Sequence, residues 1–368
     1  MYASQLLPYG ASEEDLRELT ERFGPRAYLE LKKCRISCPS CFLADKDELL
    51  LPSTGESVYS TSFLNAAIIG CALLMRDAEE AASTLALLDD LGLDFMTLSW
   101  QAAFLLELRE HGFITEEDAE GIPLARGAAI LRELALRVTE RRGEIGEAFA
   151  RGWRGALELF GEDKRRYTML VRDQDCLYDP RVSGLGTMEF EQVVSPRGPT
   201  SASAGSATYV PGLPEERLCR LTARMGVGEQ ALGRIFSPPW GMNVGRLTRY
   251  SEDWFSLFSS LGICNRYQIN RFYHAELVRD LYAAVTGVEL EVGEMMDKAA
   301  AAWGLYRELN AREGLGSEAD VPPEAWFDEQ PLWGRGGHLR DYLGNELTRE
   351  DILTLIGDYH DERGRKHG

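Results

Sequence analysis

Apolar residues recur every three or four positions along most of the chain, which is the spacing that places them on one face of an α-helix. In the first such segment Leu16, Leu19 and Phe23 share a face. Ser12 precedes this segment as a capping residue, and Gly24 ends it. The sequence therefore predicts a mainly α protein. The helical segments expected after the first are 64–88 (with a break at Asp77), 100–111, 130–138 (ended by Gly143), 145–160, 215–226, 253–258, 271–285, 292–310 and 348–359.

Other stretches lack this periodicity. Residues 46–60 and 195–213 are rich in Pro, Ser and Gly and predict turns and loops, whereas Tyr167–Val171 resembles a strand. A polar run marks a domain boundary near residue 165. The predicted organisation is two helical domains, 1–165 and 166–368.

The charge balance narrows the range of partners. The chain has 368 residues, with 40 Lys and Arg against 59 Asp and Glu, and a formal net charge of −19 at pH 7. Such an acidic surface argues against nucleic acids and anionic membranes as partners. The N-terminus has no basic and apolar leader, and the longest apolar run, 63–75, is far shorter than a membrane span. We therefore expect a cytoplasmic protein with no membrane span.

Three cysteines and one aspartate lie within twelve residues, at Cys34, Cys38, Cys41 and Asp45. Thiolates at this spacing let one short loop wrap a soft metal centre such as an iron–sulfur cluster. A loop of this size supplies three ligands, so a fourth must come from elsewhere in the chain. Among the four remaining cysteines, Cys264 is the candidate.

Other interpretations of this loop stay open. A structural zinc site wants a second close pair of ligands, and the sequence has no other Cys-x-x-Cys or His pair. Disulfides are typical of small secreted scaffolds, which this chain does not resemble. The spacing Cys34-x3-Cys38-x2-Cys41 is similar to the cluster motif of radical S-adenosylmethionine enzymes, which repeat strand–helix units. Free, buried cysteines are the last alternative.

Six motifs follow one another between residues 34 and 314. They are the cysteine loop, Asp89-x-x-Gly92-Leu93-Asp94, Tyr178-Asp-Pro-Arg181, Ser195-Pro-Arg-Gly198, Leu261-Gly-Ile-Cys264 and Asn310-Ala-Arg-Glu-Gly314. Together they make the chain resemble the tungsten-dependent aldehyde:ferredoxin oxidoreductase family. The resemblance covers essentially the whole chain, but only the two helical domains of that family, domains 2 and 3. The family's N-terminal β domain, which cradles one face of the pterin cofactor, has no counterpart, so the resemblance implies a split subunit or a truncated product.

The resemblance implies a 4Fe–4S cluster on the cysteine loop. The family's loop, Cys-x2-Cys-x3-Cys, corresponds here to Cys38-x2-Cys41-x3-Asp45, so a carboxylate stands where the third thiolate is expected. Cys34 is the alternative third ligand, and Cys264 matches the distant fourth one.

The resemblance also implies a tungsten (or molybdenum) bis-pyranopterin, held by two Asp-x-x-Gly-Leu motifs. A carboxylate pairs with the guanidine-like edge of a pterin through two parallel hydrogen bonds, and the glycine lets the backbone approach the ring. Ser259 replaces the leading aspartate of the second motif, which predicts a weaker contact. The alternative for the first motif is a plain helix C-terminal turn with solvated acids. The residues implied to hold the cofactor are Asp89, Gly92, Leu93, Asp94, Arg197, Ser259, Gly262 and Ile263.

The acid–base residues of the family are missing. Ser60 stands near the place of a glutamate, Ser201 at that of a histidine and Ser203 at that of a lysine. Arg181 and Arg197 are the remaining charged candidates, suited to a pterin phosphate or a carboxylate substrate, with structural salt bridges as the alternative. The catalytic residues stay unassigned.

The function implied by the resemblance is an oxidoreductase that acts on an aldehyde or oxo group and passes electrons to a ferredoxin-like carrier. The missing acid–base pair favours another substrate, such as a thioester or an aromatic ring. A separate β subunit would complete the pterin cradle. The alternatives are a non-catalytic iron–sulfur electron-transfer subunit and a radical S-adenosylmethionine enzyme.

Overall fold

The computed structural model describes residues 12–41, 44–60, 63–199, 207–210, 212–264, 272–332 and 335–365. Helices dominate this part of the chain, and its strands form small sheets of two or three strands. The mainly α fold class is therefore confirmed. The chain divides into two compact units: the first ends at Asp175 and takes in Pro331–Gly336, and the second holds Cys176–Gln330 and the chain from Gly337 onward.

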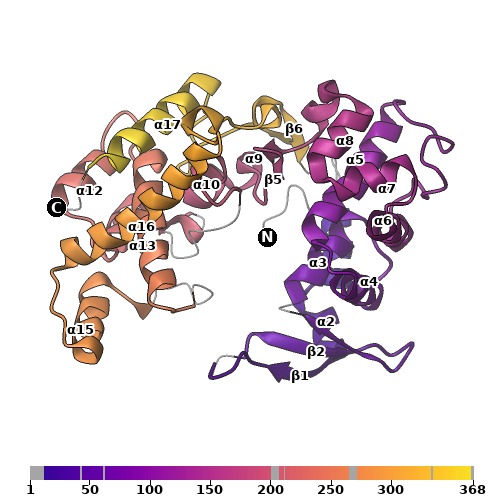
Figure 1. The fold of residues 1–368 in the computed structure, drawn as a ribbon, viewed down its shortest axis with the longest axis horizontal. Helices are drawn as coiled ribbons and strands as arrows, with labels where there is room; N and C mark the ends of the chain where they lie inside the picture. The colour runs from indigo at the N-terminus through magenta and orange to yellow at the C-terminus, as the bar shows by residue number, and fades with distance from the viewer. Residues whose placement is uncertain are drawn as a thin grey trace. The chain divides into compact units, whose positions relative to one another are not determined.

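The first unit combines a helical bundle with an antiparallel sheet of order β1-β2-β3 (Figure 1). Leu85, Leu105 and Leu131, from three successive helices of the bundle, are almost completely buried in its core. The elements are α1 (Glu13–Phe23), α2 (Pro25–Leu31), β1 (Lys32–Ile36), β2 (Lys46–Leu50), β3 (Ser57–Ser60), α3 (Phe63–Ala72), α4 (Ala78–Asp90), α5 (Phe95–Glu110), α6 (Ala128–Glu140), α7 (Gly143–Ala150), α8 (Gly152–Phe160), the 3₁₀ turn Glu162–Tyr167, β4 (Leu170–Val171) and β5 (Gln174–Asp175).

Short-range side-chain contacts explain where several helices begin. At α1 the Asp15 N–H donates to Ser12 Oγ at 3.2 Å, and the Ser12 N–H donates to Asp15 Oδ2 at 2.7 Å. The two residues form a capping box, which confirms Ser12 as the predicted cap. Asp77, the predicted break, caps α4 by accepting the Glu80 N–H at 2.8 Å.

Several local predictions were wrong. Residues 46–50 and 57–60 form β2 and β3, where a loop was expected, and only 51–56 form the turn between them. Leu49 of β2 pairs with Val58 of β3 and is buried. The stripe 145–160 is two helices, broken where Gly152 has φ +71°. Gly143 begins α7 instead of ending α6, and the strand expected at 167–171 contains only Leu170–Val171.

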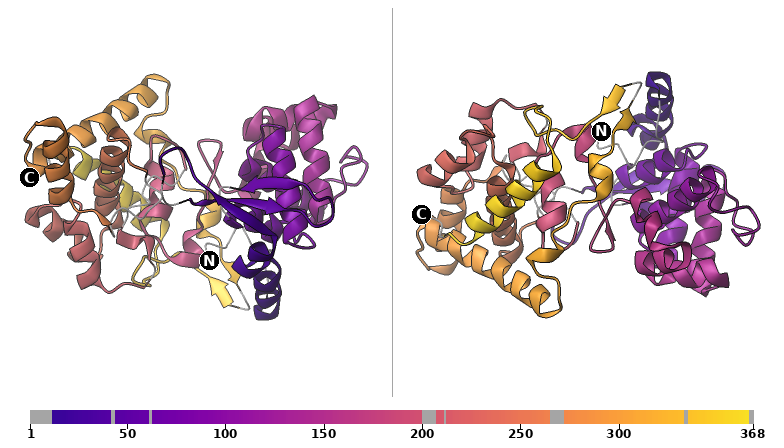
Figure 2. Two further views of the ribbon diagram at one scale, coloured as in Figure 1. Left: turned by 90° about the horizontal axis from the view of Figure 1, so that it is seen from below. Right: turned by 90° about the horizontal axis from the view of Figure 1, so that it is seen from above.

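The second unit is built around α13, which contacts α10, α16 and α17; Figure 2 shows these helices from two further sides. The helix expected at 253–258 is the end of this longer one. The elements are α9 (Pro180–Ser183), α10 (Thr187–Val194), the 3₁₀ turn Ala207–Tyr209, α11 (Glu215–Ala223), α12 (Glu229–Ile235), α13 (Val244–Ser260), α15 (Ala275–Thr286), α16 (Val292–Arg312), the 3₁₀ turns Ser317–Ala319 and Glu324–Phe327, and α17 (Arg349–Arg363). Strands β6 (Gln330–Leu332) and β7 (Arg335–Gly337) pair with each other, and most of both strands belongs to the first unit.

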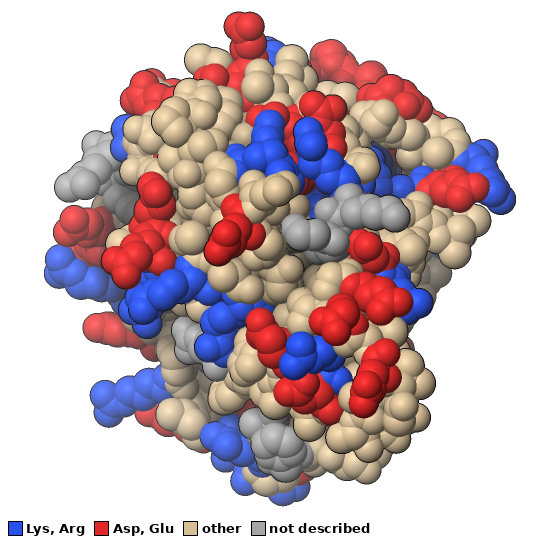
Figure 3. Space-filling view, turned by 90° about the vertical axis from the view of Figure 1, so that its left-hand side faces the viewer, with Lys and Arg blue, Asp and Glu red and all other residues tan. Residues whose placement is uncertain are grey.

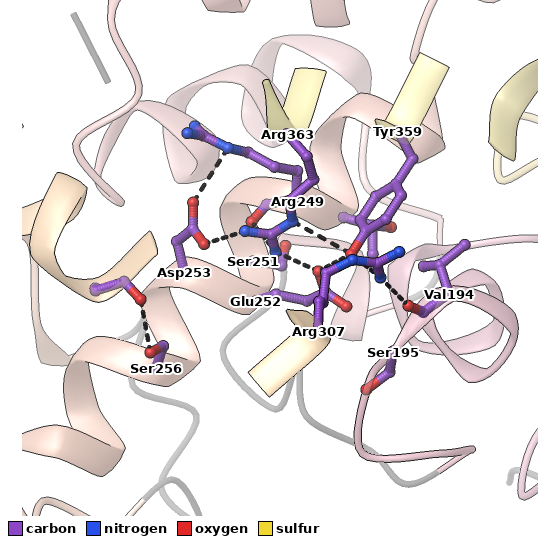
Figure 4. A network of polar contacts seen from close by, with 12 residues as sticks. Val194, Ser195, Arg249, Ser251, Glu252, Asp253, Ser256, Arg307, Tyr359 and Arg363 are labelled. Atoms are coloured by element: carbon purple, nitrogen blue, oxygen red, sulfur yellow. Dashed lines mark hydrogen bonds and ion pairs between the residues drawn. The ribbon is translucent and has the colours of Figure 1, made fainter. Parts of the chain in front are cut away.

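A buried ionic network joins α13 to α17 (Figure 4). Glu252 and Asp253 of α13 are fully buried, and the Arg363 guanidinium of α17 contacts both carboxylates. Tyr359 Oη donates to Glu252 Oε2 at 2.6 Å. Burial raises the pKa of Glu252. Because a buried carboxylate without partners is very costly, this network fixes the position of α17 on α13.

The surface carries both signs of charge. On the face shown in Figure 3, acidic and basic side chains are interspersed. None of the helices that the structure describes has the length and apolar character needed to span a membrane.

Candidate functional site

Cys34 lies on strand β1, directly opposite Glu48 of β2. Its Sγ donates to Glu48 Oε2 at 3.1 Å, and Lys33 Nζ donates to the other carboxylate oxygen at 2.8 Å. The hydrogen bond to Glu48 raises the pKa of the Cys34 thiol, and the bonds from Lys33 and Cys34 lower the pKa of Glu48 to about 2. The Cys34 thiol is thus held by a hydrogen bond on the strand, and metal binding would require it to leave Glu48 as a thiolate.

Cys38 and Cys41 lie in the loop that connects β1 to β2. The Cys41 N–H donates to the Cys38 carbonyl at 3.0 Å, and Ser40 between them has φ +64°. Lys46 Nζ lies 3.1 Å from Cys38 Sγ and 3.5 Å from Asp45 Oδ1. One ammonium group therefore bridges the first cysteine of the family spacing and the aspartate at its third position. Residues 42–43 lie outside the described part of the chain.

In the ranges that the structure describes, no three His, Cys, Asp or Glu side chains gather in a way that could hold a metal ion. Cys264 is exposed just beyond α13, in the second unit, whereas Cys38 and Cys41 belong to the first. The convergence of Cys264 with the loop stays a prediction.

The first acidic motif is the turn between α4 and α5. The Leu93 N–H donates to the Leu88 carbonyl at 2.9 Å and the Gly92 N–H to the Asp89 carbonyl at 3.0 Å. With Gly92 at φ +69°, this is a Schellman turn, which ends α4 and leaves Asp89 exposed. Partial burial and the neighbouring Asp90 raise the pKa of Asp89.

Asp94 caps the next helix, since its Oδ1 accepts the Thr97 N–H at 2.7 Å. One carboxylate oxygen of Asp94 is therefore hydrogen-bonded to the N-terminus of α5. A Cβ built on Gly92 meets no atom within 4 Å, so the outer side of the turn is open. The arrangement leaves Asp89 and the glycine accessible to a flat ligand.

The second motif has the same backbone. The Ile263 N–H donates to the Phe258 carbonyl at 2.9 Å, and Gly262 has φ +70° with open space around its Cβ position. Ser259 occupies the place of Asp89, and Cys264 occupies that of Asp94. A pocket of about 230 Å³ adjoins this turn, lined by Leu257, Ser260, Leu261, Tyr282, Leu290, Met295, Lys298 and Ala299.

The Ser195-Pro-Arg-Gly198 segment is held by α16. Arg307 Nη1 donates to the Val194 carbonyl (Figure 4), and Asn310 Nδ2 donates to the Pro196 carbonyl. Arg197 is exposed, with its guanidinium 5.0 Å from the centre of the Phe255 ring. The motifs around Arg197 and Asn310 therefore meet in space, which their sequence spacing did not predict. Ser201, Ser203 and the Ser60 side chain lie outside what the structure describes.

Arg181 is in a buried ion pair rather than in an open site. Its Nε and Nη2 contact both oxygens of Asp179 at 2.7–3.2 Å, and its Nη1 donates to the Asp328 carbonyl at 2.9 Å. The structure therefore supports the salt-bridge alternative for Arg181, because its guanidinium group donates to Asp179 and to the Asp328 carbonyl.

Asp175 of β5 is a chemically notable residue that sequence reasoning missed. Its Oδ1 accepts the Trp153 indole N–H at 2.7 Å, and its Oδ2 accepts the Thr97 hydroxyl at 2.8 Å. Burial, with a smaller contribution from the charge of Asp94, raises the pKa of Asp175 to about 7. No local pattern marks this residue, since its partners are 22 and 78 positions away.

The comparison with protein families decides the assignment. Residues 2–367 match the family described as aldehyde ferredoxin oxidoreductase, domains 2 & 3. The chain belongs to this family. The family resemblance expected from the six motifs is thereby confirmed. The radical S-adenosylmethionine alternative was wrong, because the described strands form small sheets rather than repeated strand–helix units.

A solved structure supports the fold assignment. The chain is similar to the active site complex BamBC of benzoyl coenzyme A reductase in complex with 1,5-dienoyl-CoA, with a TM-score of 0.75 and 16% sequence identity. The similarity covers 100% of this chain and 57% of that one, so the chain spans little more than half the length of this relative. A comparison with curated protein sequences finds no significant match.

Proposed function

We propose that this chain is the helical part of a tungsten or molybdenum pterin oxidoreductase, with a 4Fe–4S cluster and a ferredoxin-like electron acceptor. The observation that carries the proposal is the family match over residues 2–367, combined with an exposed acidic turn at the position of the family's pterin motif. A separate β subunit would supply the other side of the pterin site.

Asp89 and Asp94 are the proposed contacts to the first pterin. The exposed Asp89 carboxylate can accept two parallel hydrogen bonds from a guanidine-like edge, and the open space at Gly92 admits a flat ring next to the backbone. Ser259 offers a single hydroxyl at the matching turn, so we expect a weaker second contact. Leu93, Gly262 and Ile263 shape the two turns. When bound, the metal–pterin group would supply oxo or hydride chemistry.

Cys38, Cys41 and Cys264 are the proposed thiolate ligands of the cluster. Asp45 is the preferred third loop ligand, because Lys46 brings its carboxylate towards Cys38, whereas Cys34 is engaged by Glu48 on the strand. Thiolates suit a cluster, and hydrogen bonds and positive charge at the sulfur tune its potential. Lys46 is placed to do this.

The substrate class follows from the missing acid–base residues and from the structural relative. That relative is a benzoyl coenzyme A reductase complex containing 1,5-dienoyl-CoA. We propose that this protein also acts on an unsaturated or aromatic thioester rather than on a simple aldehyde. Arg197, exposed beside Phe255, is available to an anionic group of such a substrate or of the pterin.

Metal analysis of the full chain after anaerobic purification tests the proposal. We expect about four iron atoms per chain, together with tungsten or molybdenum and a fluorescent pterin released on oxidation. Asp89→Asn should lower pterin and tungsten or molybdenum content and leave iron unchanged, with Asp90→Asn, next to it on α4, as the matched control. Iron without either heavier metal, even with a co-expressed β partner, would exclude the catalytic role.

That outcome would favour the second candidate, a non-catalytic iron–sulfur electron-transfer subunit. The specific observation behind it is Ser259, which removes one of the two carboxylates that the family uses for its pterins. The two candidates differ in pterin content and agree in iron content.

A further inference from the structure

Thr97, in the first turn of α5, is hydrogen-bonded to two carboxylates. The Thr97 N–H donates to Asp94 Oδ1 at 2.7 Å, and the Thr97 hydroxyl donates to Asp175 Oδ2 at 2.8 Å. Asp94 belongs to the acidic motif, whereas Asp175 comes from β5. If the first turn of α5 moved, Thr97 would lose its hydrogen bonds to Asp94 and to Asp175 together. The position of Asp94 therefore depends on Asp175.

The hydrogen bonds that Thr97 and Trp153 donate to Asp175 come from neutral groups. Its second oxygen accepts the indole N–H of Trp153, which is a neutral donor. The nearby guanidinium groups of Arg154 and Arg165 pair with Asp173 instead. Burial is the main cause that favours a proton on Asp175, and repulsion from the Asp94 carboxylate adds to it.

We propose that Asp175 is a positioning residue for Asp94, joined to it through Thr97, and that the charge of Asp94 sets the proton occupancy of Asp175. The proposal rests on the proposed function only in taking Asp94 as a pterin contact. When a hydrogen-bonding edge engages Asp94, the repulsion weakens. The proton occupancy of Asp175 near neutral pH then decreases.

The coupling can be measured without any cofactor. The indole ¹⁵N–¹H resonance of Trp153 in the full chain, assigned by its loss in Trp153→Phe, reports the charge of Asp175 during a pH titration. We expect a midpoint near pH 7, in line with the raised pKa of Asp175. Asp175→Asn should abolish the transition, and Asp94→Asn should move its midpoint to lower pH. Asp90→Asn is the matched control and should leave it in place.

An unchanged midpoint in Asp94→Asn would overturn the coupling. Wild-type protein and Asp94→Asn answer this question even if Asp175→Asn does not fold. This result does not depend on whether the chain ever binds a pterin.

Pterin content after anaerobic purification tests the positioning role. Thr97→Val removes the hydroxyl contact to Asp175 and should lower pterin content several-fold, whereas Thr97→Ser keeps the hydroxyl and should restore it. If Asp94→Asn lowers pterin content and Thr97→Val does not, the positioning role is overturned. If Asp94→Asn itself leaves pterin content unchanged, the assignment of Asp94 in the proposed function fails, and the titration result stands on its own.

Discussion

Arg307 Nη1 of α16 donates to the backbone oxygen of Val194 at 2.6 Å, directly before the Ser195-Pro-Arg-Gly198 segment. The Arg307 guanidinium also stacks against Tyr359 and pairs with the buried Asp320 at 3.5 Å. The Arg307 side chain thus links the backbone at Val194 to the buried polar residues of the second unit. The loop that carries Arg197 depends on this core for its position.

Arg307→Met keeps the apolar stem and removes the charge. We expect it to destabilise the protein by about 3 kcal/mol, because a buried carboxylate loses a partner and a buried carbonyl loses its donor. Urea unfolding measures the change. Arg312→Met, on the same helix but in an exposed pair with Glu308, should cost less than about 0.5 kcal/mol. Equal losses in the two variants would contradict the role of the network.

Gly92→Ala separates backbone strain from ligand approach. Gly92 and Gly112 have φ +69° and +71°. Each ends its own helix in a turn of the same type, and each has open space at the Cβ position. Each Ala variant should therefore lose about 1 kcal/mol of stability. Pterin content should fall only in Gly92→Ala, because Gly112 lies outside the motif. A parallel fall in both would show that strain alone explains the effect.

Cysteine variants test the cluster ligands. Cys38→Ser, Cys41→Ser and Cys264→Ser should each lower iron content and the visible absorbance of the cluster in anaerobically purified protein. Cys219→Ser, at a half-buried cysteine of α11 outside the loop, is the control and should retain both. Asp45→Asn should lower iron content more than Cys34→Ser does. The reverse order would assign the third position to Cys34.

The protonation of Asp175 predicts a pH-dependent stability difference. Its pKa is about 7 in the folded protein and about 4 in an unfolded chain. Between these values the folded state holds a proton that the unfolded state has released, so the contribution of Asp175 to stability falls as the pH rises towards 7 and is constant above. Asp175→Asn cannot titrate. The unfolding free energy of the variant relative to wild type should therefore rise between pH 5 and pH 8, by up to about 2 kcal/mol. A constant difference would place the Asp175 pKa near its ordinary value.

The sequence by itself determined the features that depend on a few neighbouring residues. Ser12 with Asp15, and Asp77 with Glu80, begin their helices through contacts three positions apart, so spacing was enough to place them. Gly92 and Gly262 end theirs for the same local reason. The order of the motifs was likewise enough to indicate the family, because it needs no knowledge of how the helices pack.

Only the tertiary structure decided what the polar side chains do. Arg181 could have met a ligand or an ion pair, and burial beside Asp179 selects the ion pair. Residues 46–50 and 57–60 form strands because β2 pairs with β1 on one side and with β3 on the other. The link from Asp94 through Thr97 to Asp175 joins residues from distant parts of the chain, and their electrostatics depend on burial. The spacing of residues along the chain reflects local backbone geometry. The desolvation of side chains and the pairing of distant residues arise only when the chain packs.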